Sequence, residues 1–422
     1  MDLYKGLSSF AEIDAKVVVK PWARYPDKNI IPYESCFAHF RKRLFNKLQN
    51  RLLILGVLTR KSPKTDSNYS VQDYDQTVTY SSTKKILNKT RFKPDAIIVT
   101  FMQNFLSFKN IYELNEITNA PVYIYMMDMA PMTGGCHYAW DCKGYLNSCG
   151  NCPAMYSVKA NDQSRMNWLF KKERILKTNI TAVAATEYQY RQLQQGSMFK
   201  EKSRYKILLG IDNEIYRPGN KKQARQYFHL PVNRKIIFFG AMSVNSGRKG
   251  YIELIKSLEI LKNEMTGWQD VYLAIAGRVS EELRGNMPFD HSFLGYLAHT
   301  ELALAFQAAD LFLSPSVEDS GPMMINQAIM CGTPVVAFEM GVALDLVITG
   351  KTGYRAKLKD CRDLATGINY VVNLGDSEYL AMTRNCAELG QKQLLPGNQA
   401  KSLIHIFNHD IEKIQIKSDK PE

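Results

Sequence analysis

Residues 314–338 read SPSVEDSGPMMINQAIMCGTPVVAF and carry the most informative pattern of this chain. Apolar residues before this stretch and at its end predict two buried strands, at 311–313 and 334–338, with a helix over 322–330 between them. An acidic turn, 318–321, joins the first strand to the helix. A helix that begins after such a turn can direct its free amides at a phosphate while the carboxylates hold hydroxyl groups. The stretch therefore predicts a site for a ligand that carries both groups, such as a nucleotide sugar.

The same alternation of apolar runs and amphipathic segments extends through the second half of the chain. Short apolar runs lie at 235–240, 271–276, 292–297, 311–315 and 334–338, and helical patterns lie at 251–263, 301–309, 322–330 and 360–372. The first half is less regular, with apolar runs at 17–19, 96–100, 122–126, 182–186 and 206–209. Strands separated by helices of about ten residues predict parallel, doubly wound sheets. The fold class is therefore α/β, with two Rossmann-like domains.

The length of 422 residues predicts two domains rather than one core. We expect an amino-terminal domain over 1–206, a Gly- and Pro-punctuated linker over 207–220, a carboxyl-terminal domain over 221–395, and a helix and tail over 396–422. The chain opens on a helical pattern before its first strand. We therefore expect the amino-terminal domain to lack the usual first strand and Gly-rich turn; the alternative is a diverged domain that begins on a helix.

Charge is distributed unevenly along the chain. Residues 1–206 hold 31 Lys and Arg against 17 Asp and Glu, whereas residues 207–422 hold 23 against 24. A basic half indicates an anionic partner, which could be a membrane surface, a phosphorylated lipid or nucleic acid; the alternative is a merely solvated basic surface. No aromatic platform interleaved with basic residues is present in the sequence, so nucleic acid is not expected. An apolar leader and runs of about 18 apolar residues are also missing, which predicts a cytoplasmic protein.

Residues 37–61 form a basic amphipathic pattern. Phe37, Phe40 and Leu44 share one helical face, and Arg41 and Lys47 are among the cations around it. Such a helix can lie on an anionic bilayer, which would make the protein peripheral on the inner face of the plasma membrane. The alternative is a surface helix packed on the sheet.

Eight short motifs between 205 and 395 resemble, in order, those of family-4 retaining glycosyltransferases of the GT-B architecture. They are Gly210-Ile-Asp, Phe239-Gly-Ala, Arg248-Lys-Gly, Ala276-Gly-Arg, Phe293-Leu-Gly-Tyr, Ala308-Ala-Asp-Leu-Phe-Leu-Ser-Pro-Ser, Cys331-Gly-Thr-Pro-Val-Val and Gly350-Lys-Thr-Gly. The resemblance implies two domains that face each other across a cleft, a nucleotide-diphosphate sugar as co-substrate, no catalytic metal, and transfer that retains the anomeric configuration.

The resemblance also implies roles for individual residues. Lys249 matches the family's diphosphate-binding lysine, with Arg248 beside it. Asp319 matches the first of two acids that flank the donor sugar, with Glu318 as an alternative, and Gln327 replaces the second acid. Further donor-binding positions are Gly240, Gly277, Arg278, Leu294 and Gly295 at strand ends, and Ser320, Gly321, Pro322 and Met323 at the helix start. The alternatives are an exposed helix start for Lys249 and a solvent-facing helix position for Gln327.

Residues 126–153 resemble a cysteine-bearing branch of the same family that builds bacterial polysaccharides. Met127-Asp128 stands where that branch usually has His-Asp, so Asp128 matches and the histidine is replaced. His137 follows ten residues later and is the candidate to enter the site in its place. The alternatives for His137 are a metal ligand or a structural residue.

Four of the eight cysteines lie within seventeen residues: Cys136, Cys142, Cys149 and Cys152. Their spacing, C-x5-C-x6-C-x2-C, suits a tetrahedral, structural zinc ion without an open position. Buried free thiols and a redox pair are the alternatives.

Together these observations predict a retaining hexosyltransferase that acts on a glycan or lipid-diphosphate-linked acceptor in bacterial surface polysaccharide biosynthesis. The leaving phosphate would take the acceptor's proton, while Lys249, Arg248 and helix amides hold the developing charge. The main alternative is a catalytically inactive scaffold that binds sugar nucleotides, which the replacements at Met127 and Gln327 favour. A GT-B phosphorylase or sugar-phosphate synthase is a further alternative.

Overall fold

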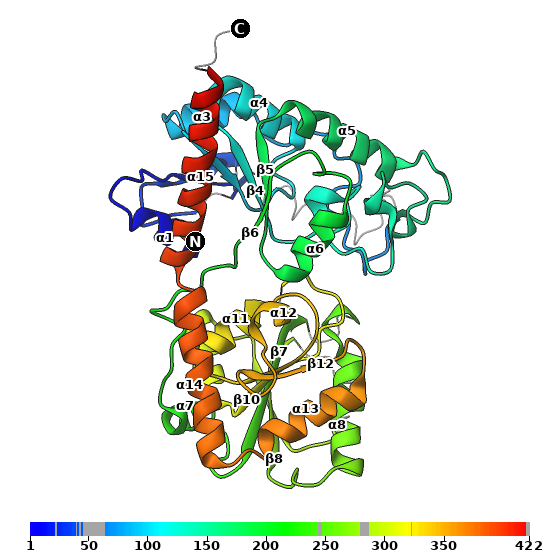
Figure 1. The fold of residues 1–422 in the computed structure, drawn as a ribbon, viewed down its shortest axis with the longest axis vertical. Coiled ribbons are helices and arrows are strands. Elements are labelled where there is room, and N and C mark those ends of the chain that lie inside the picture. Colours follow the sequence, from blue (N-terminus) through cyan, green and yellow to red (C-terminus); the bar gives the residue numbers. More distant parts are fainter. Residues whose placement is uncertain are drawn as a thin grey trace. The chain divides into compact units, whose positions relative to one another are not determined.

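The computed structural model describes residues 1–21, 23–38, 40–41, 44, 64–243, 247–278, 287–321 and 323–418. The chain forms two compact units (Figure 1). Unit 1 consists of residues 1–6, 184–192 and 206–422, and unit 2 consists of residues 7–183 and 193–205. Residues 1–6 and 184–192 thus cluster with the carboxyl-terminal half of the chain.

Unit 1 contains a six-stranded sheet in the order β12-β11-β10-β7-β8-β9. The strands are β7 (Lys235–Ser243), β8 (Val271–Arg278), β9 (His291–Gly295), β10 (Leu311–Ser314), β11 (Val335–Phe338) and β12 (Gly353–Ala356). All of their pairings are parallel. Because parallel strands end at the same edge, the turns that follow β7, β8, β9 and β10 gather at one edge of the sheet.

Helices of about ten residues connect these strands, as the apolar periodicity predicts. They include α8 (Tyr251–Glu264), α10 (His299–Ala308), α11 (Met323–Met330) and α12 (Ala343–Leu346). The helix α7 (Lys221–Tyr227) precedes the sheet, and α13 (Cys361–Val372), α14 (Asp376–Gln393) and α15 (Pro396–Ser418) follow its last strand. Phe238, Phe306 and Phe312 meet in the core, with the ring of Phe306 edge-on to both others at centroid distances of 5.2 Å. This aromatic contact joins α10 to the centre of the sheet.

Unit 2 is built around a four-stranded sheet in the order β3-β4-β5-β6. Its strands are β3 (Ile97–Val99), β4 (Val122–Met126), β5 (Ile180–Ala184) and β6 (Arg204–Lys206), with helices α3 (Thr83–Thr90), α4 (Phe108–Thr118) and α5 (Gln163–Lys177). Most of the next helix, α6 (Glu187–Gln195), belongs to unit 1. The strand expected at 17–19 exists as β1 (Val17–Val19). It follows α1 (Asp2–Ser8) and pairs in parallel with β2 (Ile30–Pro32) in a separate two-stranded sheet, outside the main sheet.

The predicted α/β class with two Rossmann-like units is confirmed. Within the described residues, none of the helices is both long and apolar enough to cross a membrane. Most of the basic amphipathic segment at 37–61 lies outside the described residues, although Phe37, Phe40 and Leu44 are described and exposed.

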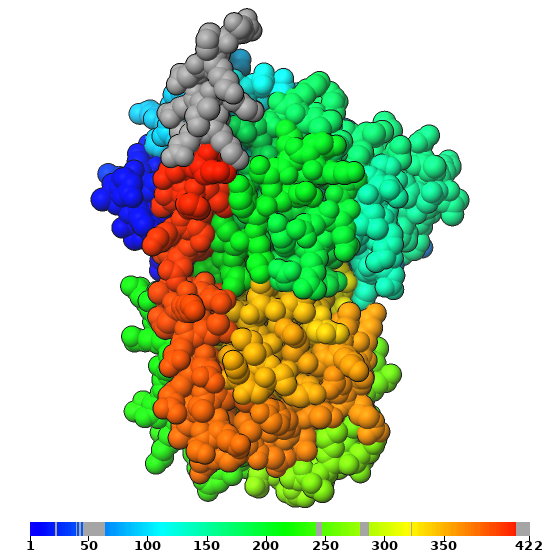
Figure 2. Space-filling model, in the orientation of Figure 1, coloured from blue at the N-terminus to red at the C-terminus, as the bar shows by residue number. Residues whose placement is uncertain are grey.

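An irregular loop joins β4 to α5 in unit 2 and carries the cysteine motif. Between residues 127 and 162 it contains three short turns of 3₁₀ helix: η1 (Ala130–Met132), η2 (Gly144–Leu146) and η3 (Pro153–Met155). It contributes the turquoise surface of unit 2 in the space-filling view (Figure 2). Irregular segments of this length inside a domain are uncommon and are usually functional.

Candidate functional site

In unit 1, two turns at the carboxyl edge of the sheet are fixed against each other. The 3₁₀ turn η4 (Gly247–Lys249) leads into α8, and the backbone N–H groups of Val317 and Glu318 donate to the carbonyl of Arg248 at 2.9 and 3.2 Å. Gly250 has φ of +71°, and a Cβ there would lie 1.7 Å from the carbonyl oxygen of Pro315. Only glycine allows this approach, so residues 248 and 319 are brought together by the backbone itself.

Both cations of this region contact one carboxylate. Arg248 Nη1 lies 2.8 Å and Lys249 Nζ 2.5 Å from Asp319 Oδ2. Burial alone would raise the pKa of Asp319, but the charges of Lys249 and Arg248 outweigh it and hold that pKa below its ordinary value. Two cations that share one carboxylate can also hold the oxygens of an anionic ligand.

The start of α11 completes this edge. Thr186 Oγ1 donates to the carbonyl of Ser320 at 2.7 Å, and a Cβ at Gly321 would lie 2.7 Å from the methyl group of Thr186. Position 321 therefore suits glycine, because the side chain of Thr186 packs against it. Pro322 lies outside the described residues, and Met323 is the first residue of α11.

Gln327 is buried, with 6% of its surface exposed, so the solvent-facing alternative for this residue is wrong. Its Oε1 atom is among the buried side-chain atoms that have no hydrogen-bond partner in the described part of the chain. An unpaired buried acceptor is costly, by about 1–3 kcal/mol, unless a ligand or water completes it. Glu318 is buried as well, and its backbone N–H donates to the carbonyl of Arg248.

The remaining donor-binding candidates lie at the ends of neighbouring strands. Gly240 is in β7, Gly277 and Arg278 end β8, and Leu294 and Gly295 end β9. Gly277 has a structural reason to be glycine, since a Cβ there would lie 1.7 Å from the carbonyl oxygen of Ala241. Gly295 also has a positive φ, yet nothing lies within 4 Å of a Cβ built there. The structure thus gathers all described donor candidates at one edge of the sheet.

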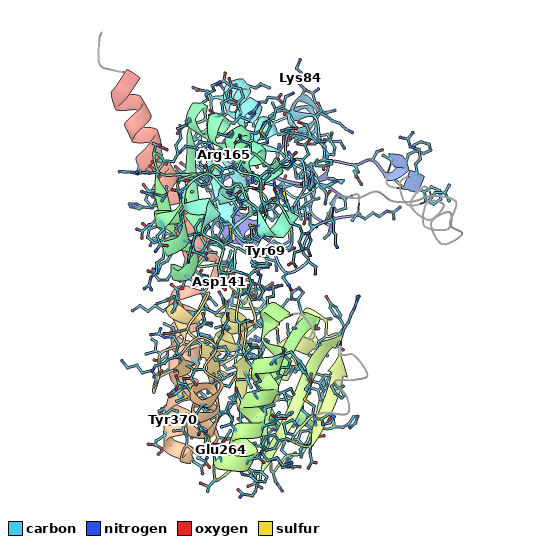
Figure 3. All side chains as sticks on the ribbon, turned by 90° about the vertical axis from the view of Figure 1, so that its right-hand side faces the viewer. Tyr69, Lys84, Asp141, Arg165, Glu264 and Tyr370 are labelled. Atoms are coloured by element: carbon cyan, nitrogen blue, oxygen red, sulfur yellow. The ribbon has the colours of Figure 1, made fainter. Side chains whose placement is uncertain are left out.

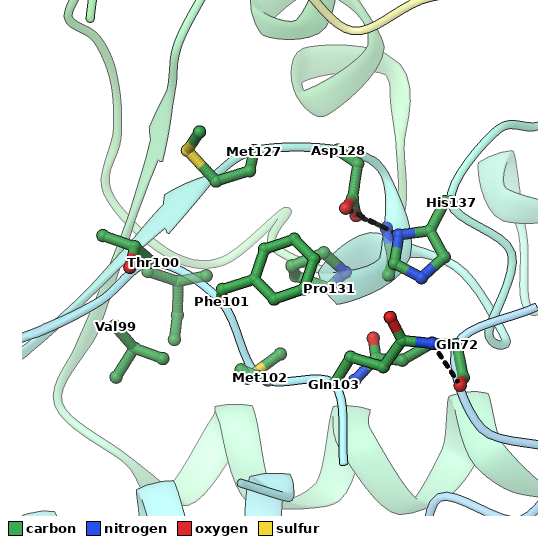
Figure 4. Close-up of a pocket in the computed structure, with 12 residues that line it drawn as sticks. Gln72, Val99, Thr100, Phe101, Met102, Gln103, Met127, Asp128, Pro131 and His137 are labelled. Carbon is green, nitrogen blue, oxygen red and sulfur yellow. Dashed lines mark hydrogen bonds and ion pairs between the residues drawn. The ribbon is translucent and has the colours of Figure 1, made fainter. Parts of the chain in front are cut away.

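In unit 2, the predicted residues Asp128 and His137 line one pocket (Figure 4). His137 Nδ1 lies 2.6 Å from Asp128 Oδ2, and the other oxygen of Asp128 accepts from the N–H of Ala130 at 2.8 Å. A carboxylate can only accept, so Nδ1 carries the hydrogen and Nε2 is the ring atom left for a ligand. Asp128 therefore orients His137.

The rest of the pocket combines amides with apolar side chains. Gln72, Gln103, Met127 and Phe101 are among its lining residues. Phe101 is 57% exposed and stacks near the ring of His137, with centroids 6.4 Å apart. Apolar and aromatic side chains with a few polar groups among them are typical of small-molecule pockets.

All four clustered cysteines line a second pocket of unit 2, together with Tyr145 and Ala154. Burial raises the pKa of the Cys136 and Cys149 thiols to about 12. Within the described residues there is no group of three or more His, Cys, Asp or Glu side chains arranged to hold a metal ion. The predicted tetrahedral zinc geometry is therefore not present, although the four thiols share one pocket.

Lys171 was not predicted from sequence. It is completely buried on α5, and its ammonium group donates to the carbonyls of Ala130 and Thr133 at 2.7 and 2.9 Å. Burial lowers the pKa of Lys171 to about 8. Lys171 lies four residues from both Asn167 and Ile175, which are buried on the same helix, and this helical spacing indicates that the lysine faces inward.

Comparisons with known proteins agree with this architecture. Residues 233–373, in unit 1, match the model of the family described as glycosyl transferases group 1. The D-inositol 3-phosphate glycosyltransferases of Mycobacterium tuberculosis (strain ATCC 25618 / H37Rv) and Mycobacterium bovis (strain BCG / Pasteur 1173P2) are 28% identical over 179 residues. These residues are 39% of this chain and 35% of the relatives, so the match spans about a third of the relatives' length.

Solved structures resemble a larger part of the chain. Sucrose-phosphate synthase from Thermosynechococcus elongatus superposes with a TM-score of 0.59 at 16% identity, covering 78% of both chains. Anabaena Alr3699/HepE in complex with UDP and glucose superposes with a TM-score of 0.57 at 16% identity, covering 78% of this chain and 81% of that one. The chain therefore has the GT-B fold of glycosyltransferases. Its unit 1 carries the part that matches the group 1 family.

Proposed function

We propose that this protein is a glycosyltransferase that moves a sugar from a nucleotide-diphosphate donor to a glycan or lipid-diphosphate-linked acceptor. The observation that carries the proposal is the contact of Arg248 and Lys249 with Asp319 at the carboxyl edge of a sheet that matches the group 1 family. The solved HepE complex contains UDP and glucose, which supports a uridine diphosphate sugar as a donor to test.

For the donor, we propose that the diphosphate replaces Asp319 as the partner of the two cations. Arg248 can hold phosphate oxygens with two N–H groups, while Lys249 acts as a point charge. The unpaired Oε1 of Gln327 would accept a hydrogen bond from a donor hydroxyl. Asp319, once released, would be available to the sugar hydroxyls.

We propose transfer with retention of the anomeric configuration. The bond between the anomeric carbon and the phosphate oxygen breaks, and the acceptor oxygen bonds to that carbon on the same face. The acceptor's proton passes to the leaving phosphate, whose charge Lys249 and Arg248 hold. No covalent bond to the protein is needed in this scheme.

For the acceptor, we propose the pocket of unit 2. Nε2 of His137 and the amides of Gln72 and Gln103 can bond hydroxyl groups, and the exposed ring of Phe101 can pack against a sugar face. The basic composition of residues 1–206 suits an acceptor or membrane surface that carries phosphate. On this basis we propose a cytoplasmic role, peripheral to the inner membrane face, in surface polysaccharide biosynthesis.

Calorimetry with UDP- and GDP-linked hexoses tests donor binding directly. We expect one of them to bind, and we expect Lys249→Ala to lower turnover about 10²-fold, the effect of losing one charge-stabilising donor. Lys256→Ala is the matched control, because Lys256 is an exposed cation on α8 away from Asp319. The proposal would be contradicted if neither UDP- nor GDP-linked hexoses gave a heat of binding. It would also be contradicted if Lys249→Ala turned over as fast as the wild type. Nuclear magnetic resonance of the product's anomeric carbon tests retention separately.

A second candidate, an inactive scaffold that binds sugar nucleotides, is favoured by Met127 and Gln327, which replace a histidine and an acid of the resembled family. The two functions separate in one assay. A scaffold binds donor but neither transfers nor hydrolyses it, and the double variant Met127→His with Gln327→Glu would then gain turnover. A transferase turns over without these changes.

A further inference from the structure

The cysteine cluster, defined as Cys136, Cys142, Cys149 and Cys152, is not used by the proposed transfer reaction. We propose that it binds one Zn²⁺ ion, which fixes the loop over 127–162 that carries His137. This inference is independent of whether the protein transfers sugars.

The placement of the four sulfurs is the first argument. They come from separate turns of one irregular loop, yet all four line a single pocket. The eight cysteines of the chain are free thiols, so the loop is not closed by a disulfide. Ala139, Tyr145 and Ala154 of this loop are nevertheless buried. A structural metal is one of the devices that stabilise small segments with little regular secondary structure.

Hydrogen bonds to the sulfurs are the second argument. The N–H of Gly144 donates to Cys142 Sγ at 3.4 Å, and the N–H of Gly134 donates to Cys149 Sγ at 3.1 Å. A neutral thiol is a weak acceptor, whereas a metal-bound thiolate is a charged one. Amide donors of this kind orient ligands and offset their charge in metal sites.

The turn between the last two cysteines is the third argument. Cys149, Gly150 and Asn151 all have positive φ, at 56°, 98° and 48°. The turn is also tightly held, since a Cβ at Gly150 would lie 2.2 Å from the carbonyl oxygen of Ala160. Non-glycine residues adopt this conformation only when the surrounding structure requires it. A tight C-x2-C turn places two thiolates on one ion in structural zinc sites.

A buried cation beside the cluster can offset the charge of the bound state. One Zn²⁺ with four thiolates carries a net charge of −2, and each thiol releases its proton to solvent on binding. The buried ammonium group of Lys171 interacts electrostatically with Cys149 and Cys136 and offsets part of that charge. Because the described sulfurs are not yet in metal-binding geometry, binding must draw them inward until each lies about 2.3 Å from the ion.

The surroundings explain why such an ion would matter to the pocket of His137. Lys171 bonds the carbonyls of Ala130 and Thr133, and Arg165, which extends from α5 in unit 2 (Figure 3), donates to Ser148. Both contacts tie the loop to one helix. The N–H of Met129 donates to the carbonyl of His137 at 3.1 Å. His137 directly follows Cys136 in the chain, so a shift of this cysteine also moves the histidine.

Metal analysis of the full chain, purified under reducing conditions without chelator, is the direct test. We expect about one zinc per chain, and Co²⁺ in its place should give the intense visible bands of a tetrahedral thiolate site. Cys149→Ser should lower the bound zinc at least about tenfold. Cys361→Ser is the matched control, since Cys361 lies on α13 of unit 1 and should leave zinc unchanged. Eight titratable thiols without metal, a disulfide within the cluster, or iron in place of zinc would each overturn the proposal.

A second measurement keeps the test decisive if Cys149→Ser does not fold. In the wild-type chain, removal of zinc by a chelator should speed amide hydrogen exchange over residues 130–157 at least about tenfold, while exchange in β8 stays unchanged. Cys149→His, which keeps a ligand, should retain zinc. Loss of zinc without faster exchange in the loop would show that the ion does not fix it, and would overturn that part of the inference.

Discussion

The two candidate sites of this molecule are built in different ways. In unit 1 the site lies at the carboxyl edge of a regular parallel sheet, and glycine-dependent backbone contacts bring Lys249 and Asp319 together. In unit 2 the site lies under an irregular loop, and buried side chains such as Lys171 and Asp128 hold it in place. The first kind of site depends on backbone geometry, whereas the second depends on a few polar side chains. Substitutions at glycine should therefore damage unit 1, and substitutions of buried polar groups should damage unit 2.

The largest effect is expected at Gly250 of unit 1. In Gly250→Ala the new methyl group would overlap the carbonyl of Pro315, so the two turns must separate, at a cost of about 3 kcal/mol or more in the free energy of unfolding. Hydrogen exchange of the amides in β7 and β8 measures this cost.

Gly295→Ala is the control for that prediction. Gly295 has nearly the same φ, 70° against 71°, but open space around its Cβ position. The Gly295→Ala variant should therefore lose only about 1 kcal/mol in the free energy of unfolding, which is the strain of an alanine in the left-handed conformation. Equal losses in the two variants would show that the contact between the turns does not matter.

The next effect is expected at Lys171 of unit 2. Lys171→Met keeps much of the volume but leaves the carbonyls of Ala130 and Thr133 without their donor, so unit 2 should lose about 2–4 kcal/mol. Lys177→Met, on the exposed end of the same helix, should leave the stability of unit 2 essentially unchanged. Denaturant unfolding, monitored by amide hydrogen exchange in β4, measures the free energy of unfolding of both variants. Similar stability of the two variants would contradict the view that buried polar groups hold the loop.

These two regions also differ in how far the sequence predicts them. The strands and helices of unit 1 follow the apolar periodicity, and the Gly- and acid-containing turn at 318–321 falls where the pattern places it. The parallel pairing follows from the same alternation, because a strand, a helix and a strand can be connected in few other ways.

Sequence predicts the loop of unit 2 less completely. The motif indicates that Asp128, His137 and four cysteines matter, but the carboxylate–imidazole contact depends on tertiary folding that periodicity does not encode. A lysine inside the core, Lys171, opposes the ordinary preference of its residue type, so composition alone assigns it to the surface. The ion pairs of Asp319 with its two cations are likewise visible only once the turns are in place.

Asp319 offers a smaller, pH-dependent test of unit 1. Because its pKa is lowered in the folded protein, it contributes stability at pH values above the ordinary aspartate pKa of about 3.9 and loses it as pH falls through the folded value. Asp319→Asn should therefore lose about 1–3 kcal/mol at neutral pH, with the difference from wild type shrinking below about pH 4. A difference that stays constant from about pH 7 to about pH 3 would contradict the ion-pair explanation.

The smallest effect is expected from Asp128→Asn in unit 2, and it tests orientation. The amide side chain of this variant can still accept from the N–H of Ala130, but its oxygen and nitrogen cannot both replace the carboxylate, so His137 Nδ1 loses a charged acceptor that fixes the ring. If the proposed acceptor site is right, the KM for acceptor should rise about tenfold while donor affinity in calorimetry stays unchanged.

Two substitutions of His137 itself test the same pocket directly. His137→Gln, which places an amide near the position of Nε2, should recover part of the acceptor affinity that His137→Ala loses, because an amide can still bond a hydroxyl group. If both His137 variants bind the acceptor as tightly as the wild type does, this pocket does not bind the acceptor. The proposed assignment of the acceptor to unit 2 would then be wrong.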